Sequence, residues 1–296
     1  MATRKHPLLI GIVGVVIALA LFFVLVLSVS FFMARKGDIL PSEKIGVVPV
    51  KGVITDAQSI IDQLRKFRKN QNIKAIVVRI DSPGGGVGPA QEIYREIKKI
   101  RQEKEVFASI GSIAASGGYY VACATSKIIA NPGSITGSIG VIVEYANIEE
   151  LMEKIGLKGV VIKSGKYKDI LSPFREMSEE ERDLIQNVTD SIHDQFISSV
   201  AEGRNLEKAQ VAAIADGRIF TGLHAQEMGL VDAIGNFYDA IDIAAESVGI
   251  TGEPEIVYPE KRLSLFDYLF EEVSQRWGQY LCFPYRFRYL SPLQPE

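Results

Sequence analysis

The chain has 296 residues, of which 47 % are hydrophobic and 23 % are charged, so it can bury the core of one large domain or two ordinary ones. Its net charge of −3 gives no basic surface for nucleic acid, and it has neither a zinc-ligand spacing nor an aromatic RNA-binding motif. The two cysteines, Cys123 and Cys282, form neither a CxxC pair nor a disulfide framework. We therefore expect no nucleic-acid partner, no metal and no cofactor.

Residues 8–33 carry no charged side chain, and a helix of that length, at about 1.5 Å per residue, spans the apolar core of a bilayer. A cleaved signal peptide has a shorter apolar region that ends in small residues. Here Ala18 and Ala20 lie in the middle of the run, which favours an uncleaved transmembrane anchor. The flank at residues 1–7 and the polar linker at residues 34–44 carry similar positive charge, so charge counting leaves the membrane orientation open.

From residue 45 onward the sequence alternates between short apolar runs and amphipathic segments. This alternation predicts an α/β domain over residues 45–250. A capping box at residues 178–181 opens a long predicted helix. Strands are expected at residues 45–50, 73–80, 106–110, 127–130, 139–143, 160–162 and 218–220, and helices at 56–69, 90–101, 119–124, 178–201 and 206–215.

The last part of the chain, residues 251–296, differs in character from the predicted domain. An apolar helical stripe runs from Phe266 to Trp277, and an aromatic run follows at residues 283–287. Such a tail is compatible with a docking arm, a helix on a membrane surface, or packing against protein. Because apolar stripes usually face protein, we favour packing or contact between protomers.

The stretch from Gly111 to Tyr120, G-S-I-A-A-S-G-G-Y-Y, joins a predicted strand to a predicted helix. Small neighbours leave the hydroxyl of Ser116 uncrowded, and the start of a helix has free N–H groups that favour negative charge. A nucleophile that generates an oxyanion needs both features. The simpler alternative is a serine that caps the helix, followed by glycines that allow tight packing.

The loop from Asp81 to Gly86, D-S-P-G-G-G, directly follows a predicted strand. Three successive glycines let backbone N–H groups approach a substrate, either as an oxyanion hole or as an edge for an extended peptide. The alternatives are a phosphate-binding loop and a plain turn. A phosphate loop of the Walker type requires G-K-[ST] after the glycines, and Val87-Gly88-Pro89 stands there instead.

A serine nucleophile requires a base, and the sequence leaves its identity open. The G-x-S-x-G elbow is absent because Ala114 occupies the first glycine position. His193 or His224 could complete a triad, although nothing around them favours it. A lysine can also act as the base when burial lowers its pKa. Spacing alone does not choose among the clustered Lys163, Lys166 and Lys168.

Five motifs occur in order and together resemble the short form of the signal peptide peptidase A family. They are D-S-P-G-G-G, A-A-S-G-G-Y-Y, G-S-I-T-G-S-I-G-V, S-G-K-Y-K-D and G-R-I-F-T-G followed by G-L-V-D, within residues 45–248. The resemblance implies a membrane-anchored serine peptidase with a Ser–Lys dyad and a layered α/β fold related to Clp protease and crotonase. No motif covers the tail beyond residue 252.

Carried over by position, the resemblance makes Ser116 the nucleophile and Lys168, in K-Y-K-D, the general base. It also suggests that Ser138, in T-G-S-I-G, orients the lysine amine. The oxyanion hole would be formed by the N–H groups of Gly117 and Gly85, with Gly84 as the near alternative.

The resemblance further implies how such a chain assembles and what it cleaves. A single-length chain would build each site from neighbouring protomers of a homo-oligomeric ring. Its substrates would be remnant signal peptides and other short or unfolded peptides, cleaved by a domain outside the cytoplasm. Two other classes stay open at this point, namely a non-catalytic membrane scaffold and a crotonase-type thioester hydrolase.

Overall fold

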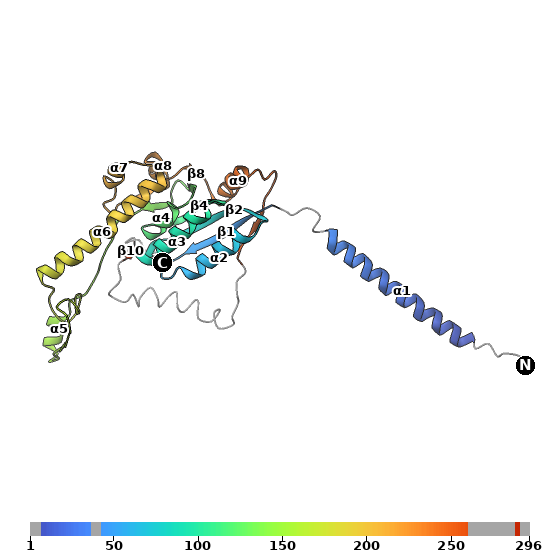
Figure 1. The fold of residues 1–296 in the computed structure, drawn as a ribbon, viewed down its shortest axis with the longest axis horizontal. Coiled ribbons are helices and arrows are strands. Elements are labelled where there is room, and N and C mark those ends of the chain that lie inside the picture. The colour runs from blue at the N-terminus through green and yellow to red at the C-terminus, as the bar shows by residue number, and fades with distance from the viewer. Residues whose placement is uncertain (1–6, 37–42, 260–287, 291–296) are drawn as a thin grey trace, which may run out of the picture. The chain divides into compact units, whose positions relative to one another are not determined.

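The computed structural model describes residues 7–36, 43–259 and 288–290, with side chains described for residues 14, 16–30 and 43–259. The chain divides into two compact units, residues 1–42 and residues 43–296. Each unit has its own character. The first consists of a helix in its described part, and the second contains the mixed α/β fold (Figure 1).

The first unit contains α1 (Pro7–Lys36), which covers the run predicted to be an anchor. The side chains of residues 16–30 are exposed and almost all apolar. Within the residues that the structure describes, no helix is long and apolar enough to cross a membrane. The predicted helix is therefore confirmed as a helix, and its transmembrane role stays a prediction.

The second unit is built around an eight-stranded sheet (Figure 1). Its main path runs β7-β6-β4-β2-β1-β9, while β5 pairs with β4 and β8 pairs with β5. The pairing is parallel except between β6 and β7. The strands are β1 (Lys44–Lys51), β2 (Ile73–Ser82), β4 (Glu105–Ala115), β5 (Lys127–Ala130), β6 (Ile135–Gly137), β7 (Ile219–Thr221), β8 (Ala233–Ile234) and β9 (Glu255–Val257).

Helices cover both faces of this sheet, because successive strand residues point to opposite sides. On β1, Val48 and Val50 face the larger core, which also contains buried residues of several helices. Ile45 and Val47 face a smaller core beneath one helix. The helices of the larger core include α2 (Gln58–Lys69), α3 (Val87–Ile100) and α4 (Gly117–Ala122), and α9 (Phe237–Ser247) covers the opposite face. The predicted layered α/β fold is thus confirmed.

Residues 144–190 form an arm that projects from this body, with α5 at its far end and the first half of α6 along it (Figure 1). The second half of α6 is held in the larger core by Phe196 and Val200. Helices α7 and α8 follow against the body. The bounds of these helices are α5 (Glu149–Lys154), α6 (Glu179–Arg204), α7 (Lys208–Ala212) and α8 (Gly222–Glu227).

A second, two-stranded sheet joins distant parts of the chain. The glycines after β2 form β3 (Gly84–Gly86), which pairs antiparallel with β10 (Arg288–Leu290). The predicted tail therefore contributes two strands, because β9 also lies within residues 251–296. The apolar stripe at residues 266–277 and the aromatic run at residues 283–287 lie outside the described residues.

Two strand predictions are wrong. The strand expected at residues 139–143 lies instead at residues 135–137, because Ser138 adopts φ 51° and ends the pairing of β6. Residues 160–162 form no strand, and Ile162 is 97 % exposed. An apolar run forms a strand only where a neighbouring strand can hydrogen-bond to it, and residues 160–162 have no such neighbour among the described residues. Their apolar composition alone therefore gave a wrong strand prediction. Strand β4 also continues to Ala115, five residues past its predicted end.

Candidate active site

Ser116 lies at a sharp turn between the end of β4 at Ala115 and the start of α4 at Gly117. Its backbone has φ 53° and ψ −118°, a strained conformation for a residue with a side chain. The Ser116 N–H donates to the carbonyl of Gly137 at 2.9 Å, and its carbonyl accepts from the N–H of Tyr120 at 2.8 Å. A strained turn between strand and helix is the backbone setting in which a nucleophilic serine is presented at the end of a sheet.

The hydroxyl of Ser116 is buried and has no hydrogen-bond partner among the described residues. The residue is 1 % exposed, and its side chain makes no capping hydrogen bond to α4. A buried hydroxyl without a partner costs on the order of 1–3 kcal/mol, a penalty that a purely structural serine would avoid. Because the Ser116 side chain makes no capping hydrogen bond, the interpretation of Ser116 as a side-chain helix cap is wrong. The unpaired buried hydroxyl favours the interpretation of Ser116 as a nucleophile.

Ser138 directly follows β6, the strand that pairs with the end of the strand before Ser116. Strands β4 and β6 are parallel, and Ala115 pairs with Gly137, so the serines follow a paired position on each strand. Ser138 is buried, has φ 51°, and donates its N–H to the carbonyl of Arg218 at 2.8 Å. The structure therefore brings the two predicted serines together at the same end of the sheet.

The glycine strand β3 runs beside this turn and is fixed along one edge by Ile54. The N–H of Ile54 donates to the carbonyl of Gly84 at 2.8 Å, and the N–H of Gly86 donates to the carbonyl of Ile54 at 2.8 Å. A Cβ on Gly85 would lie 2.2 Å from the Ile54 oxygen, so only glycine fits there. Ile54 was not singled out from the sequence, because main-chain pairing leaves no signature in the side chain.

The serine turn and the glycine loop pack directly against each other. Ser82 pairs with Ala114 across β2 and β4, and a Cβ on Gly118 would lie 2.7 Å from the carbonyl oxygen of Ser82. The Ser82 hydroxyl also accepts from the N–H of Gly84 at 3.1 Å. Gly117 opens α4, where the first N–H groups have no partner within the helix. The structure therefore gathers Ser116, Ser138 and the three glycines predicted to bind the oxyanion, Gly84, Gly85 and Gly117.

Lys168 lies elsewhere, on the exposed arm. The hydroxyl of Ser116 has no partner among the described residues, so the two members of the predicted dyad do not meet within one chain. His193 lies on α6 and His224 is exposed on α8, and neither reaches that hydroxyl. Among the described residues of the chain, the structure thus brings no candidate base to the hydroxyl of Ser116.

The three clustered lysines have different surroundings on the arm. Lys163 forms an ion pair with Asp169, and Lys166 forms one with Glu180. The Glu180 carboxylate raises the pKa of Lys166, which is the wrong direction for a general base. No carboxylate among the described residues pairs with Lys168. This difference favours Lys168, which spacing alone could not select.

A charged network holds the loop that carries Lys168. The Arg175 guanidinium donates to both Asp169 and Glu181, and Glu181 completes the capping box with Ser178 at the start of α6. Hydrogen bonds from Arg175 lower the pKa of Glu181 to about 2, and those from Arg175 and Lys163 lower the pKa of Asp169. The arm therefore has its own fixed structure, although few of its side chains reach a hydrophobic core.

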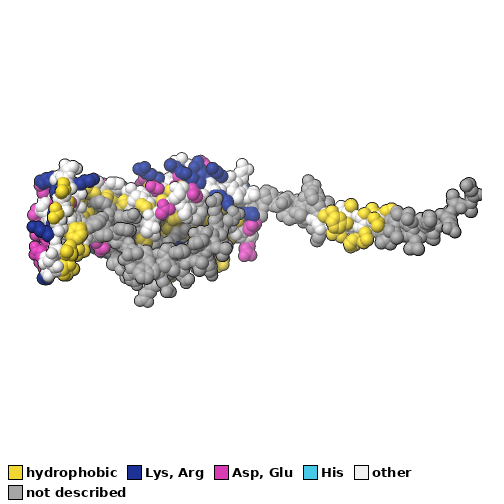
Figure 2. Space-filling view, turned by 90° about the horizontal axis from the view of Figure 1, so that it is seen from below, with side chains coloured by type: hydrophobic (Ala, Val, Ile, Leu, Met, Phe, Trp, Pro, Cys, Tyr) yellow, Lys and Arg dark blue, Asp and Glu magenta, His cyan; other side chains and the backbone are white. Residues whose placement is uncertain are grey.

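The arm also exposes an unusual number of large apolar side chains, which appear in yellow at the left end of the molecule in Figure 2. Exposed apolar surface of this extent usually marks a contact with another protein or with a membrane. The exposed apolar residues of the arm are Leu151, Ile155, Leu157, Val160, Val161, Ile162, Tyr167, Phe174, Leu184 and Val188.

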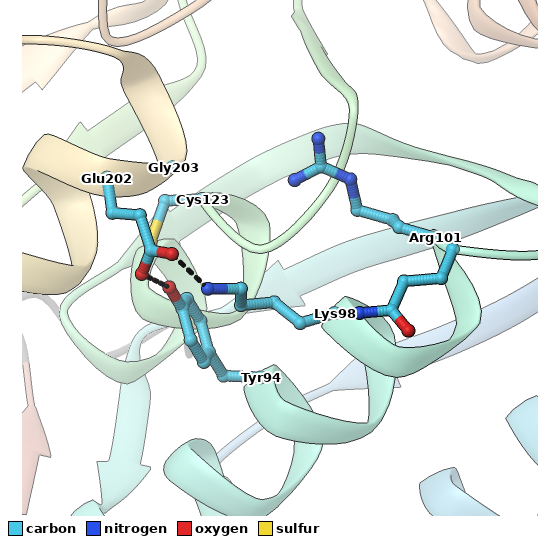
Figure 3. Close-up of a pocket in the computed structure, with 7 residues that line it drawn as sticks. Tyr94, Lys98, Arg101, Cys123, Glu202 and Gly203 are labelled. Carbon is cyan, nitrogen blue, oxygen red and sulfur yellow. Dashed lines mark hydrogen bonds and ion pairs between the residues drawn. The ribbon is translucent and has the colours of Figure 1, made fainter.

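A cavity of about 350 Å³ lies between α3, α4 and α6 (Figure 3). Glu202 accepts a hydrogen bond from Tyr94 and pairs with Lys98 (Figure 3), while Arg101 donates to the carbonyl of Ala124. Burial raises the pKa of Cys123 to about 12, which keeps its thiol neutral and unreactive. Among the described residues no group of His, Cys, Asp or Glu side chains is arranged to hold a metal ion. The cavity offers no second catalytic centre.

Known proteins match this chain over most of the second unit. A model of peptidase family S49 matches residues 98–251, and a model of the Clp protease family matches residues 43–135. A protein of Synechocystis sp., provisionally named a protease, is 46 % identical over 70 % of this chain and 76 % of its own length. A protein of Enterococcus faecium, provisionally named signal peptide peptidase SppA, is 37 % identical over 73 % of this chain and 67 % of its own length. The chloroplastic serine protease SPPA of Arabidopsis thaliana is 35 % identical over 69 % of this chain and 30 % of its own length.

Proposed function

Because the chain belongs to peptidase family S49 and is a serine peptidase of the SppA family, we propose that it is a membrane-anchored endopeptidase with a Ser116–Lys168 dyad. Family membership sets aside the non-catalytic scaffold and the thioester hydrolase that the sequence left open. The proposal concerns the residues that carry the reaction, the assembly that completes the site and the peptides that it cleaves.

The observation that carries this proposal is the state of the Ser116 side chain. The hydroxyl is buried, unpaired among the described residues, and held on a strained turn beside the glycine strand. A serine in this setting has little structural use and is ready to react once a base approaches. The adjacent backbone N–H groups supply the other requirement, because an oxyanion must be stabilised where it forms.

The proposed reaction uses Ser116, Lys168 and the N–H groups of the neighbouring glycines. The neutral amine of Lys168 takes the proton of the Ser116 hydroxyl, and the oxygen attacks the carbonyl carbon of a peptide bond. The N–H groups of Gly117 and Gly85, or Gly84 as the near alternative, stabilise the oxyanion. Lys168 then protonates the leaving amine, which leaves an acyl-enzyme. Water hydrolyses the acyl-enzyme with Lys168 again acting as base, and Ser138 orients the lysine amine.

A second copy of the chain would supply the base. Lys168 lies on an exposed arm, Ser116 has no base from its own described chain, and the arm carries exposed apolar side chains that an interface would cover. A head-to-tail contact in which each arm reaches the next Ser116 would close into a ring if the rotation between neighbouring copies divides a full turn evenly. In such a ring the neighbouring copy would cover the arm that carries Lys168.

The anchor and the substrates are proposed from the sequence and the relatives. Residues 8–33 would hold the ring at a membrane, with the catalytic domain outside the cytoplasm. The relative from Enterococcus faecium carries a name that refers to signal peptides. Remnant signal peptides and other short or unfolded membrane-associated peptides are the substrates we propose. Such extended chains can bind by adding a strand to the glycine edge.

The test compares variants of the full-length chain in detergent, assayed on an unstructured fluorogenic peptide and with a fluorophosphonate probe. Ser116→Ala and Lys168→Ala should each lower kcat by about 10⁴-fold or more, because the two groups act as a unit. Lys166→Ala is the matched control and should change kcat by less than about threefold, since its ion pair with Glu180 is exposed. Only chains with an intact Ser116 should be labelled. Full activity of Lys168→Ala, or no labelling of wild type, would contradict the proposal.

A further inference from the structure

Ser82 lies between the parts of the candidate site, although the proposed reaction gives it no role. It is the last residue of β2 and is fully buried. Its hydroxyl accepts from the N–H of Gly84 at 3.1 Å and donates to the carbonyl of the same residue at 3.5 Å. A serine hydroxyl that bonds the N–H two residues ahead forms a local turn, which Pro83 favours by fixing its own φ. The side chain of Ser82 therefore sets the direction in which the chain leaves β2.

The hydrogen bond to Ser82 determines which glycine N–H group can face a substrate. The N–H of Gly84 is engaged by the Ser82 hydroxyl. The N–H of Gly86 is engaged by the carbonyl of Ile54 at 2.8 Å. Along a strand the N–H groups of successive residues point to alternate sides, so that of Gly85 points to the edge opposite Ile54, where β10 pairs. Of the two glycines considered as oxyanion donors on this strand, Gly85 is therefore the one whose N–H faces the peptide-binding edge.

Ser82 also contacts the helix that supplies the other oxyanion donor. It pairs with Ala114 across β2 and β4, two residues before Ser116. A Cβ on Gly118 would lie 2.7 Å from the carbonyl oxygen of Ser82, so the first turn of α4 packs directly on this residue. Ser82 thus contacts the strand that leads to Ser116, the glycine strand and the start of α4.

We propose that Ser82 is a positioning residue, which fixes the N–H groups of Gly85 and Gly117 relative to each other as the two oxyanion donors. Ser82 acts through the backbone that it holds and does not touch the substrate. This inference rests on the proposed function, because it assumes that these two N–H groups stabilise the oxyanion. Such donors contribute only when they lie within hydrogen-bond distance of the position that the oxygen takes in the transition state. Loss of the Ser82 hydroxyl would therefore slow the reaction and leave the binding of the peptide nearly unchanged.

The first experiment compares peptide cleavage by full-length Ser82→Ala and Ser134→Ala chains in detergent. Ser134 is the matched control, because it is also buried and its hydroxyl donates to the carbonyl of Gly111 on β4 at 2.6 Å. Ser82→Ala should lower kcat at least tenfold and change KM by less than about twofold, whereas Ser134→Ala should keep the kcat of wild type. A wild-type kcat for Ser82→Ala, or an equal loss of kcat in both variants, would overturn the inference.

A peptide aldehyde distinguishes displaced donors from a smaller amount of folded enzyme. The Ser116 oxygen adds to the aldehyde carbon, the serine proton passes to Lys168, and the aldehyde oxygen becomes an anion at the oxyanion position without any leaving group. The inhibition constant should rise at least tenfold for Ser82→Ala, in step with the loss of kcat, and stay at the wild-type value for Ser134→Ala. A lower kcat with an unchanged inhibition constant would overturn the inference, because Ser82 would then support only the fold.

A measurement without catalysis keeps failure of the proposed function distinguishable. Amide hydrogen exchange is measured in Ser116→Ala chains with and without Ser82→Ala. Exchange within residues 83–87 should become at least tenfold faster when Ser82 is replaced, while exchange in β1 stays the same. Unchanged exchange within residues 83–87 would overturn the inference even if wild type cleaves peptides. A wild type as inactive as Ser116→Ala would overturn the proposed function, and the inference with it.

Discussion

The body of the second unit and its arm differ in how they hold their part of the candidate site. In the body, Ser116 is buried at the turn between β4 and α4, and the neighbouring glycines are fixed by Ile54 and Ser82. On the arm, Lys168 is exposed, and the loop around it is held by ion pairs on Arg175. The proposed nucleophile is therefore held by packing, whereas the proposed base is positioned by surface electrostatics.

This difference assigns different roles to the two regions. A rigid arrangement of the glycine strand β3 and Gly117 lowers the free-energy cost of stabilising an oxyanion, because the N–H groups need not reorganise during the reaction. In the proposed assembly, the exposed Lys168 meets a serine only when another copy of the chain brings its Ser116 to the arm. Activity would then depend on assembly even though the fold of each chain does not.

Outside the proposed dyad, the largest effect is expected from adding a methyl group to the glycine strand. Gly85→Ala places a Cβ 2.2 Å from the Ile54 oxygen, so the strand must move and its N–H groups leave their positions. We expect a loss of kcat/KM on the order of 100-fold or more. Gly88→Ala is the matched control, because no atom lies within 4 Å of its Cβ. Equal peptidase activity of the two variants would show that the glycine strand is not part of the site.

A smaller loss is expected from the arm. Arg175→Met removes the cation shared by Asp169 and Glu181 and should lower kcat on the order of tenfold, while the thermal unfolding of the body is maintained. Arg182→Met is the control, since its pair with Glu179 is exposed at 3.9 Å. Amide hydrogen exchange should increase within residues 160–181 only for Arg175→Met. An increase spread over the body would mean that the arm is not independent.

The same network predicts an acid limit for the arm. Hydrogen bonds from Arg175 lower the pKa of Glu181 to about 2 from an ordinary value of 4.5. A lowered carboxyl pKa contributes stability that is fully present above the unfolded value and is lost as pH falls through the folded value. Amide exchange in the arm should therefore rise between about pH 4.5 and pH 2. The Arg175→Met variant should lose this pH dependence, and its persistence would assign the titration to other groups.

The smallest effect is expected in the stability of the serine turn. Ser116→Ala removes a buried hydroxyl without a partner and should raise the free energy of unfolding by about 1 kcal/mol. Thr136→Val provides the contrast, because the Thr136 hydroxyl donates a hydrogen bond to the carbonyl of Ala114 at 2.8 Å. This substitution should lower the free energy of unfolding by about 1 kcal/mol. Urea unfolding of both variants measures the difference. Destabilisation by Ser116→Ala would mean that its hydroxyl has a structural partner.

The sequence predicts the body far better than the arm. Buried strands such as β1 and β2 have continuous apolar runs, and Ser178 opens α6 with a capping box, so local patterns identify them. The apolar run around Ile162 has the composition of a strand but no strand to pair with, and only the folded chain reveals its exposure. Candidate residues were identified by motif. Ile54 and β10 pair with the glycine strand through main-chain groups, and such pairing cannot be predicted from amino-acid composition.

The most direct test of the shared site mixes two inactive chains. Ser116→Ala chains supply Lys168 and Lys168→Ala chains supply Ser116, and the two are dissociated, combined in equal amounts and reassembled. If each site takes its serine and its lysine from different copies, random mixing should restore roughly a quarter of wild-type peptidase activity. If both groups come from one chain, the mixture stays as inactive as either variant, which would contradict the account.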